Sequence, residues 1–240
     1  TYERCWHLDQ EGDQNDLSWM LTECLKPKVI HSGTPCTKMC RVGKRQLDAQ
    51  SKQQNYITKI IVKHQQANNL GASVENPQGS LLFEQEDWKR EFGDPTTLKE
   101  PWRFYLQHGC QFAAKYPGRD DPGRPMFKPK VWMANFSLEP MELRCRNPAA
   151  LVGSTHGHRQ IRGTMYVDGV GTCSVAEYSG KYTGEECTVY ARCVAGFCQK
   201  TVRSKTVESE LTRRAAKSSL ALQSNEQRPS GPVIGAAFQQ

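Results

Sequence analysis

The chain lacks the signatures of several large protein classes. No run of eighteen apolar residues occurs and the mean hydropathy is −0.68, which excludes a membrane-spanning helix. The His-Glu-x-x-His pattern of zinc hydrolases, the Gly-x-Ser-x-Gly pattern of serine hydrolases and the glycine-rich patterns of nucleotide-binding loops are all missing. We also find no internal repeat. Common enzyme and repeat classes are therefore not indicated, and no catalytic signature is present.

Cysteine pairs of the Cys-x-x-Cys type, which are common in structural zinc sites, are also absent, although the chain has ten cysteines. The tightest spacings are Cys36-x3-Cys40 and Cys193-x4-Cys198. Because the count is even, we predict disulfide bonds in preference to zinc, and hence an oxidising, extracytosolic compartment. The predicted disulfide cysteines are Cys5, Cys24, Cys36, Cys40, Cys110, Cys145, Cys173, Cys187, Cys193 and Cys198.

The cysteines fall into two clusters separated by a long interval without any. Four lie in residues 5–40 and six in residues 110–198, so pairing within each cluster predicts two disulfide-stapled regions. We expect an α+β fold, mostly antiparallel β and disulfide-rich, with two small packed domains and a C-terminal helix or tail. A single elaborated β-sandwich is the alternative. The predicted divisions are an α+β region over 1–100, a β-rich domain over 101–204 and a basic helix and tail over 205–240.

Hydrophobic patterns predict several elements. Leu17, Met20, Leu21 and Leu25 repeat at helical spacing and predict a helix over 15–25, capped by Asp16. Residues 43–54 have helix-forming composition and residues 56–63 are β-branched, which predicts a helix and then a strand. A continuous helix to Gln66 is the alternative. Residues 81–84 would then form a returning strand.

The second half of the chain has a β-like appearance. Residues 130–136 alternate in the manner of a strand with at least one buried face. Short β-branched and aromatic runs between glycine-rich turns over 163–202 predict an antiparallel meander. Beyond it, apolar residues between 207 and 222 predict a helix that ends before Arg228.

The motif that most suggests catalysis or metal binding is Ser-Thr-His156-Gly-His158-Arg159. In an extended segment His156 and His158 point to one side, where they could ligate a metal or act on a phosphate beside Arg159. Such a site resembles that of a secreted ribonuclease, in which two imidazoles exchange protons and a cation stabilises the oxyanion. The alternative is an ordinary turn, because Gly153 and Gly157 flank the first histidine.

The positive net charge and one irregular loop favour a binding function. The net charge of +7 favours an anionic partner, and the loop over 117–125 carries Arg119 and Arg124 as candidate binding residues. Asn135-Phe-Ser137 is a candidate glycosylation sequon. We predict a protein or anionic glycan target. Nucleic acid is the alternative partner, although no nucleic-acid motif supports it.

The predicted function is a secreted, cysteine-rich binding protein that acts on an external or host target without catalysis. In composition it resembles the small cysteine-rich secreted effectors of fungi, and toxin-like or virulence roles follow from that resemblance. The chain starts with Thr1 and not with Met, which we interpret as a mature chain after removal of a leader. The alternatives are a hydrolase that uses His156 and His158, and an extracellular structural or coat component. No cofactor or metal is expected.

Overall fold

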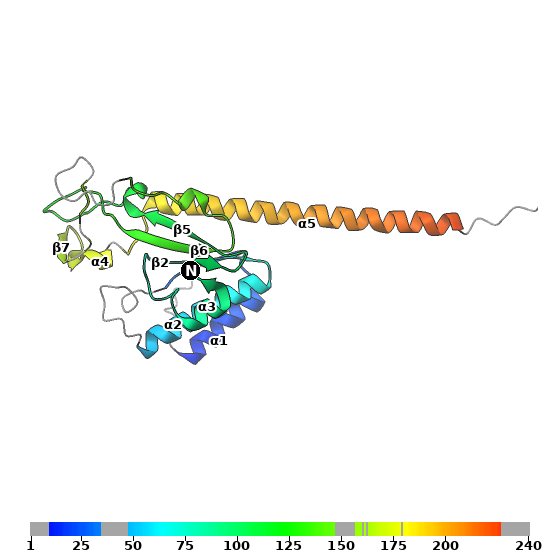
Figure 1. Cartoon of the computed structure of the whole chain (residues 1–240), viewed down its shortest axis with the longest axis horizontal. Helices are drawn as coiled ribbons and strands as arrows, with labels where there is room; N and C mark the ends of the chain where they lie inside the picture. Colours follow the sequence, from blue (N-terminus) through cyan, green and yellow to red (C-terminus); the bar gives the residue numbers. More distant parts are fainter. Residues whose placement is uncertain are drawn as a thin grey trace, which may run out of the picture. The chain divides into compact units, whose positions relative to one another are not determined.

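The computed structural model describes residues 10–34, 48–146, 157–159, 161, 163–178 and 180–226 (Figure 1). The chain divides into two compact units, Thr1–Phe197 and Cys198–Gln240. Helix α5 (Gly184–Glu226) begins in the first unit and ends in the second. Every site described below belongs to the first unit.

A four-stranded mixed sheet forms the centre of the first unit. Its strand order is β1 (Val29–Gly33), β2 (Gly71–Pro77), β6 (Pro129–Ala134) and β5 (Arg103–His108). Helix α2 (Ala49–Ala67) joins β1 to β2, which lie parallel, as expected for a crossover connection. The β2–β6 and β6–β5 pairs are antiparallel.

Helices cover both faces of this sheet (Figure 1). On one face the core packs against α2 and α3 (Glu86–Phe92). On the other face, called the α5 face here, the core packs against the first residues of α5. The buried residues of the first core are Val62, Ala72, Val74, Leu82, Phe83, Trp88, Phe92, Trp102 and Met133. Those of the α5 face are Tyr105, Phe112, Trp132, Ala134, Phe136, Leu138, Met141 and Cys193.

Smaller elements surround the sheet. The N-terminal helix α1 (Glu11–Trp19) continues as the π-helical η1 (Met20–Leu25). Two short 3-10 helices follow these strands in the chain, η2 (Gly109–Phe112) after β5 and η3 (Glu139–Met141) after β6. The remaining elements are the paired strands β3 (Gly93–Asp94) and β4 (Thr97–Leu98), the hairpin of β7 (Thr164–Val167) and β8 (Gly171–Ser174), and α4 (Val175–Tyr178).

The α+β class is confirmed, and four of the five ladders between the described strands are antiparallel. The disulfide-rich part of the prediction has no support, because the seven cysteines in the described residues are free. Cys5, Cys36 and Cys40 lie outside the described residues. No helix in the described part of the chain is long and apolar enough to cross a membrane. The central sheet takes two strands from each side of the predicted boundary at residue 100, and the domain boundaries themselves stay predictions.

The predicted meander over 163–202 is only partly correct. Its first part is the β7–β8 hairpin, but the expected strands from Cys187 onward are wrong, because α5 begins at Gly184. The reason is a capping box: the Glu186 N–H donates to the Thr183 hydroxyl, and the Thr183 N–H donates to the Glu186 carboxylate. These bonds start a helix whose β-branched residues then pack against the sheet.

In the first half, the alternative of a continuous helix is correct, since α2 runs from Ala49 to Ala67. The strand expected over 56–63 is wrong because its buried residues, which include Ile57 and Val62, follow helical spacing along one side. The strand expected over 81–84 is also wrong, since those residues form turns. The helix over 15–25 and the strand over 130–136 are confirmed, although the first helix begins at Glu11 and so Asp16 is not its cap.

Candidate functional site

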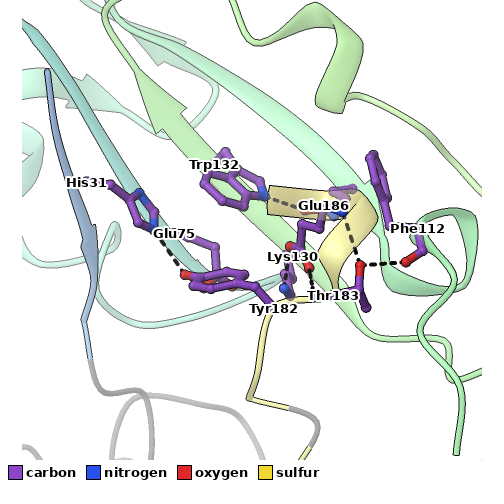
Figure 2. Close-up of polar contacts among 9 residues, drawn as sticks. His31, Glu75, Phe112, Lys130, Trp132, Tyr182, Thr183 and Glu186 are labelled. Carbon is purple, nitrogen blue, oxygen red and sulfur yellow. Dashed lines mark hydrogen bonds and ion pairs between the residues drawn. The ribbon is translucent and has the colours of Figure 1, made fainter. Parts of the chain in front are cut away.

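The α5 face carries polar side chains where a sheet usually places apolar ones. His31 comes from β1, Ser73 and Glu75 from β2, and Lys130 from β6, and Figure 2 shows three of them around Trp132. Ser73, Glu75 and Lys130 are buried, and His31 is half-buried. Because burying a polar group without a partner is costly, each of these side chains needs a specific partner.

A directional chain of hydrogen bonds satisfies three of these groups, His31, Ser73 and Glu75. The Tyr182 hydroxyl donates to Glu75 Oε2 at 2.8 Å, so its oxygen accepts from His31 Nε2 at 3.0 Å. This arrangement assigns the proton of the imidazole to Nε2, and Nδ1 therefore accepts from the Ser73 hydroxyl at 3.0 Å. The Tyr190 hydroxyl in turn lies 2.8 Å from Ser73 Oγ and donates to it. The chain ends at the Glu75 carboxylate.

The surroundings keep this chain in one protonation state. Burial, followed by the positive charge of Lys130, lowers the pKa of His31 to about 4, so the imidazole is neutral near neutral pH. Burial and then the negative charge of Glu75 raise the pKa of Tyr182 well above its usual range. Burial raises the pKa of Tyr190 to about 12. Both phenols therefore keep the protons that the chain requires.

Beside this chain lies a buried ion pair. Lys130 Nζ is 2.5 Å from Glu186 Oε1, and the two side chains are 1% and 3% exposed (Figure 2). The same ammonium lies 4.4 Å from the centre of the Tyr182 ring. The capping box orients Glu186, and the Thr183 hydroxyl also donates to the Phe112 carbonyl at 2.6 Å. The Lys130–Glu186 ion pair and the hydrogen bonds of Thr183 therefore hold the start of α5 against the sheet.

A cavity of about 280 Å³ opens next to this ion pair. Its charged lining consists of four lysines and the single acid Glu186, and two tyrosines add aromatic surface. Lys130 is buried, whereas Lys115 and Lys181 are exposed. We call this site the lysine cavity. It is lined by Gly109, Ala113, Ala114, Lys115, Met126, Lys128, Lys130, Tyr178, Lys181, Tyr182, Thr183 and Glu186.

The structure describes His158 and Arg159 of the histidine motif. His158 is buried, and its Nε2 lies 3.6 Å from Cys145 Sγ. Arg159 instead donates to Asp120 at 2.6 Å and stacks over the Tyr116 ring. His156 lies outside the described residues, so its part in a site with His158 stays a prediction.

The two loop arginines are both ion-paired. Arg119 binds Asp168 and lies 4.6 Å from the centre of the Tyr166 ring. Arg124 Nε is 2.6 Å from Asp121 Oδ2. A partner would have to compete with these carboxylates, and the assignment of both arginines as binding residues stays a prediction.

The sequon asparagine directly follows β6, an inner strand of the sheet. Asn135 Oδ1 accepts from the Ala72 N–H at 2.7 Å, and Nδ2 donates to the Leu70 carbonyl at 2.8 Å. The nitrogen that would carry a glycan thus already donates to the backbone.

Among the predicted disulfide cysteines, Cys110 and Cys145 lie together, and with His158 they place three ligand atoms within 4.8 Å of one another.

Sequence reasoning missed the whole polar network of the α5 face. The signal that could have located Glu186 is the Thr183-x-x-Glu186 capping box, which marks the start of a helix. A second signal is Lys130, which lies two and four residues before Trp132 and Ala134 and therefore on the same face of an otherwise apolar strand.

No family model, curated protein or solved structure matches this chain.

Proposed function

We propose that the protein is a binding protein that holds an anionic group, such as a phosphate, sulfate or carboxylate, in the lysine cavity. The observation that carries this proposal is the charge of the lining, which has four lysines and one carboxylate. Glu186 neutralises Lys130 at 2.5 Å, so the exposed Lys115 and Lys181 add the positive charge on which the proposal depends. The net charge of +7 adds a general attraction for anions.

The physical basis is the focusing of positive charge in a concave site. Walls of low dielectric constant around like charges strengthen the local field, and lysine ammonium groups bind phosphate as point charges. The buried Lys130–Glu186 pair fixes one wall, while the exposed Lys115 and Lys181 side chains can close on a ligand. A site with one fixed wall and movable lysine side chains should recognise the charge of a ligand group more than the exact shape of the ligand.

The size of the cavity limits the ligand. Small-molecule sites in proteins usually enclose about 300–1,000 Å³, and the lysine cavity, at about 280 Å³, lies at the lower end. It therefore fits a small anion or one charged group of a larger molecule. An anionic glycan, one of the two partner classes that the sequence predicts, can present such a group.

The other parts of the predicted function stay predictions. Secretion and an effector-like or toxin-like role depended on disulfides, and the free cysteines of the described residues give them no support. The hydrolase alternative receives no specific support either, because the His158 ring is buried against Cys145 and Phe127. No observation favours the structural or coat alternative.

Calorimetric titration with inorganic phosphate and with sulfate tests the proposal. Each ammonium a few ångströms from the anion contributes about 1 kcal/mol, so Lys115→Ala and Lys181→Ala should each weaken binding roughly fivefold. Binding should also weaken steeply with added salt, which screens exposed charges. The matched control is Lys52→Ala, which removes an exposed lysine from α2. Equal affinities in all three variants, or an equal loss in the control, would contradict the proposal.

A further inference from the structure

Three residues with metal-binding side chains, none of which lines the lysine cavity, meet at one point. Cys110 lies in η2, Cys145 follows η3, and His158 precedes Arg159, which bridges to Met126. Their Sγ and ring nitrogen atoms all lie within 4.8 Å of one another. Cys145 and His158 are buried, and Cys110 is half-buried. Segments far apart in the sequence thus bring two thiols and an imidazole to one point.

The distances match a tetrahedral metal centre. With Zn–S bonds of about 2.3 Å and Zn–N bonds of about 2.0–2.1 Å, a tetrahedral angle places the sulfur and nitrogen ligands about 3.6 Å apart. In the structure, Cys145 Sγ lies 3.6 Å from His158 Nε2. The same geometry requires two sulfur ligands about 3.8 Å apart, which the common limit of 4.8 Å for Cys110 and Cys145 allows.

We propose that Cys110, Cys145 and His158 form a binding site for zinc or a similar thiophilic divalent cation, with the fourth position left to water or another small ligand. Two thiolates, a neutral imidazole and a divalent cation sum to zero charge. A buried site of that composition avoids the large penalty of an isolated buried ion. Binding releases the two thiol protons to solvent, and no oxidation or reduction is involved.

Neighbouring residues already orient the ligands. His108 Nδ1 accepts the Cys145 N–H at 2.8 Å, which holds the backbone of that ligand in place. The Phe127 ring contacts both imidazoles, with centroid distances of 4.5 Å to His108 and 5.2 Å to His158. Such supporting contacts are typical of metal sites, where outer residues fix the ligand geometry.

The site lies where regular structure is scarce. Residues 142–146 form neither helix nor strand, and the His158 segment is joined to the body by the Arg159 N–H, which donates to the Pro125 carbonyl. A metal that connects these segments to η2 would replace the hydrogen bonds that regular elements provide. Such a cation would connect the three segments while its fourth position stays open, and it revises the expectation of no metal.

A disulfide between Cys110 and Cys145 is the competing arrangement. It would need the two sulfur atoms about 2.05 Å apart, whereas both cysteines are free in the structure. Beside a disulfide, His158 would contact Cys145 Sγ only as a hydrogen-bond partner and would bind no metal. The two arrangements differ in metal content and in covalent linkage, so experiment separates them directly.

The test uses the full chain, purified without chelator and reduced, and then titrated with Co²⁺ as the probe. We expect one equivalent of bound metal, a thiolate-to-cobalt charge-transfer band in the near ultraviolet and visible bands of tetrahedral cobalt. Because even outer-shell changes weaken metal binding about 10- to 100-fold, Cys145→Ser should weaken it at least about 100-fold. The matched control is Cys187→Ser, which alters an exposed cysteine of α5 and should bind Co²⁺ as the native chain does.

Two results would overturn the proposal. The first is equal Co²⁺ binding by the native chain and Cys145→Ser, and the second is a Cys110–Cys145 linked peptide in non-reducing mapping of the purified chain. If the serine variant does not fold, X-ray absorption of the zinc-loaded native chain decides the question. Two sulfur neighbours at about 2.3 Å with lighter atoms at about 2.0–2.1 Å support the site. A shell of only oxygen and nitrogen refutes it.

Discussion

Neutralising Glu186 should destabilise the protein strongly, because it leaves the Lys130 ammonium buried without its counter-ion. The two side chains are 1% and 3% exposed, so water does not replace the lost carboxylate. Removing one partner of a buried ion pair costs about 3–5 kcal/mol. A typical domain is stable by about 5–15 kcal/mol, so Glu186→Gln should remove a large fraction of the folding free energy.

The substitution isolates charge from local structure. Glutamine at this position can still accept the Thr183 N–H, because capping boxes use Glu or Gln alike. The Tyr182 ring, 4.4 Å from Lys130 Nζ, remains as a weaker partner worth about 0.5–2 kcal/mol. The net loss should therefore fall near 3 kcal/mol.

Urea unfolding measures this loss as a lower midpoint with an unchanged slope. The matched control is Glu86→Gln, whose partner Lys89 lies in an exposed pair, and it should change stability by less than about 0.5 kcal/mol. The double replacement Lys130→Met with Glu186→Leu should recover most of the loss, because an apolar pair carries no desolvation penalty. A loss below about 1 kcal/mol in Glu186→Gln would refute the assignment of a dry ion pair.

Three further predictions concern the neighbouring groups. Tyr182→Phe removes the hydroxyl that donates to Glu75, and the loss of that donor should cost about 1–3 kcal/mol in urea unfolding. His31 titrates in the folded state with a pKa of about 4, below the ordinary 6.5, so the unfolded chain binds more protons between these values. Stability should therefore be complete above pH 6.5 and fall by up to about 3 kcal/mol as the pH drops towards 4, a dependence that His31→Gln abolishes in unfolding curves. In thiol titration the exposed Cys24 and Cys187 should react at once, and the cysteines of the proposed metal site only after chelation. Slow reaction of Cys24 and Cys187, or no additional reactive thiols after chelation, would contradict the proposed metal site.

The sequence predicts those elements whose pattern is local. The β6 strand and the part of α5 over 207–222 follow from the spacing of apolar residues within the element itself. The β2 strand was missed because its alternation of Ala72 and Val74 with Ser73 and Glu75 is short, and its polar residues do not suggest burial although six of the seven residues are buried. The parallel pairing of β1 with β2 depends on the crossover through α2, which the sequence left as one of two alternatives.

Lys130 shows how a site residue can be partly predicted. Its two-residue spacing from Trp132 predicts the shared face of the strand, and a lysine on a buried face requires an acidic partner. That partner lies 56 positions later in the chain, at the start of a helix that the glycine-rich composition concealed. Pairing at that separation is decided by tertiary packing, so no local pattern could identify Glu186 as the counter-ion.

The cysteines illustrate a different limit. An even count in two clusters favours disulfides, but a metal site also brings cysteines together in pairs, so the count alone does not separate the two. The structure adds His158, whose Nε2 lies 3.6 Å from Cys145 Sγ and would supply the third ligand of the proposed metal site. The sequence could not connect His158 with Cys110 and Cys145, because only tertiary packing brings their three segments together.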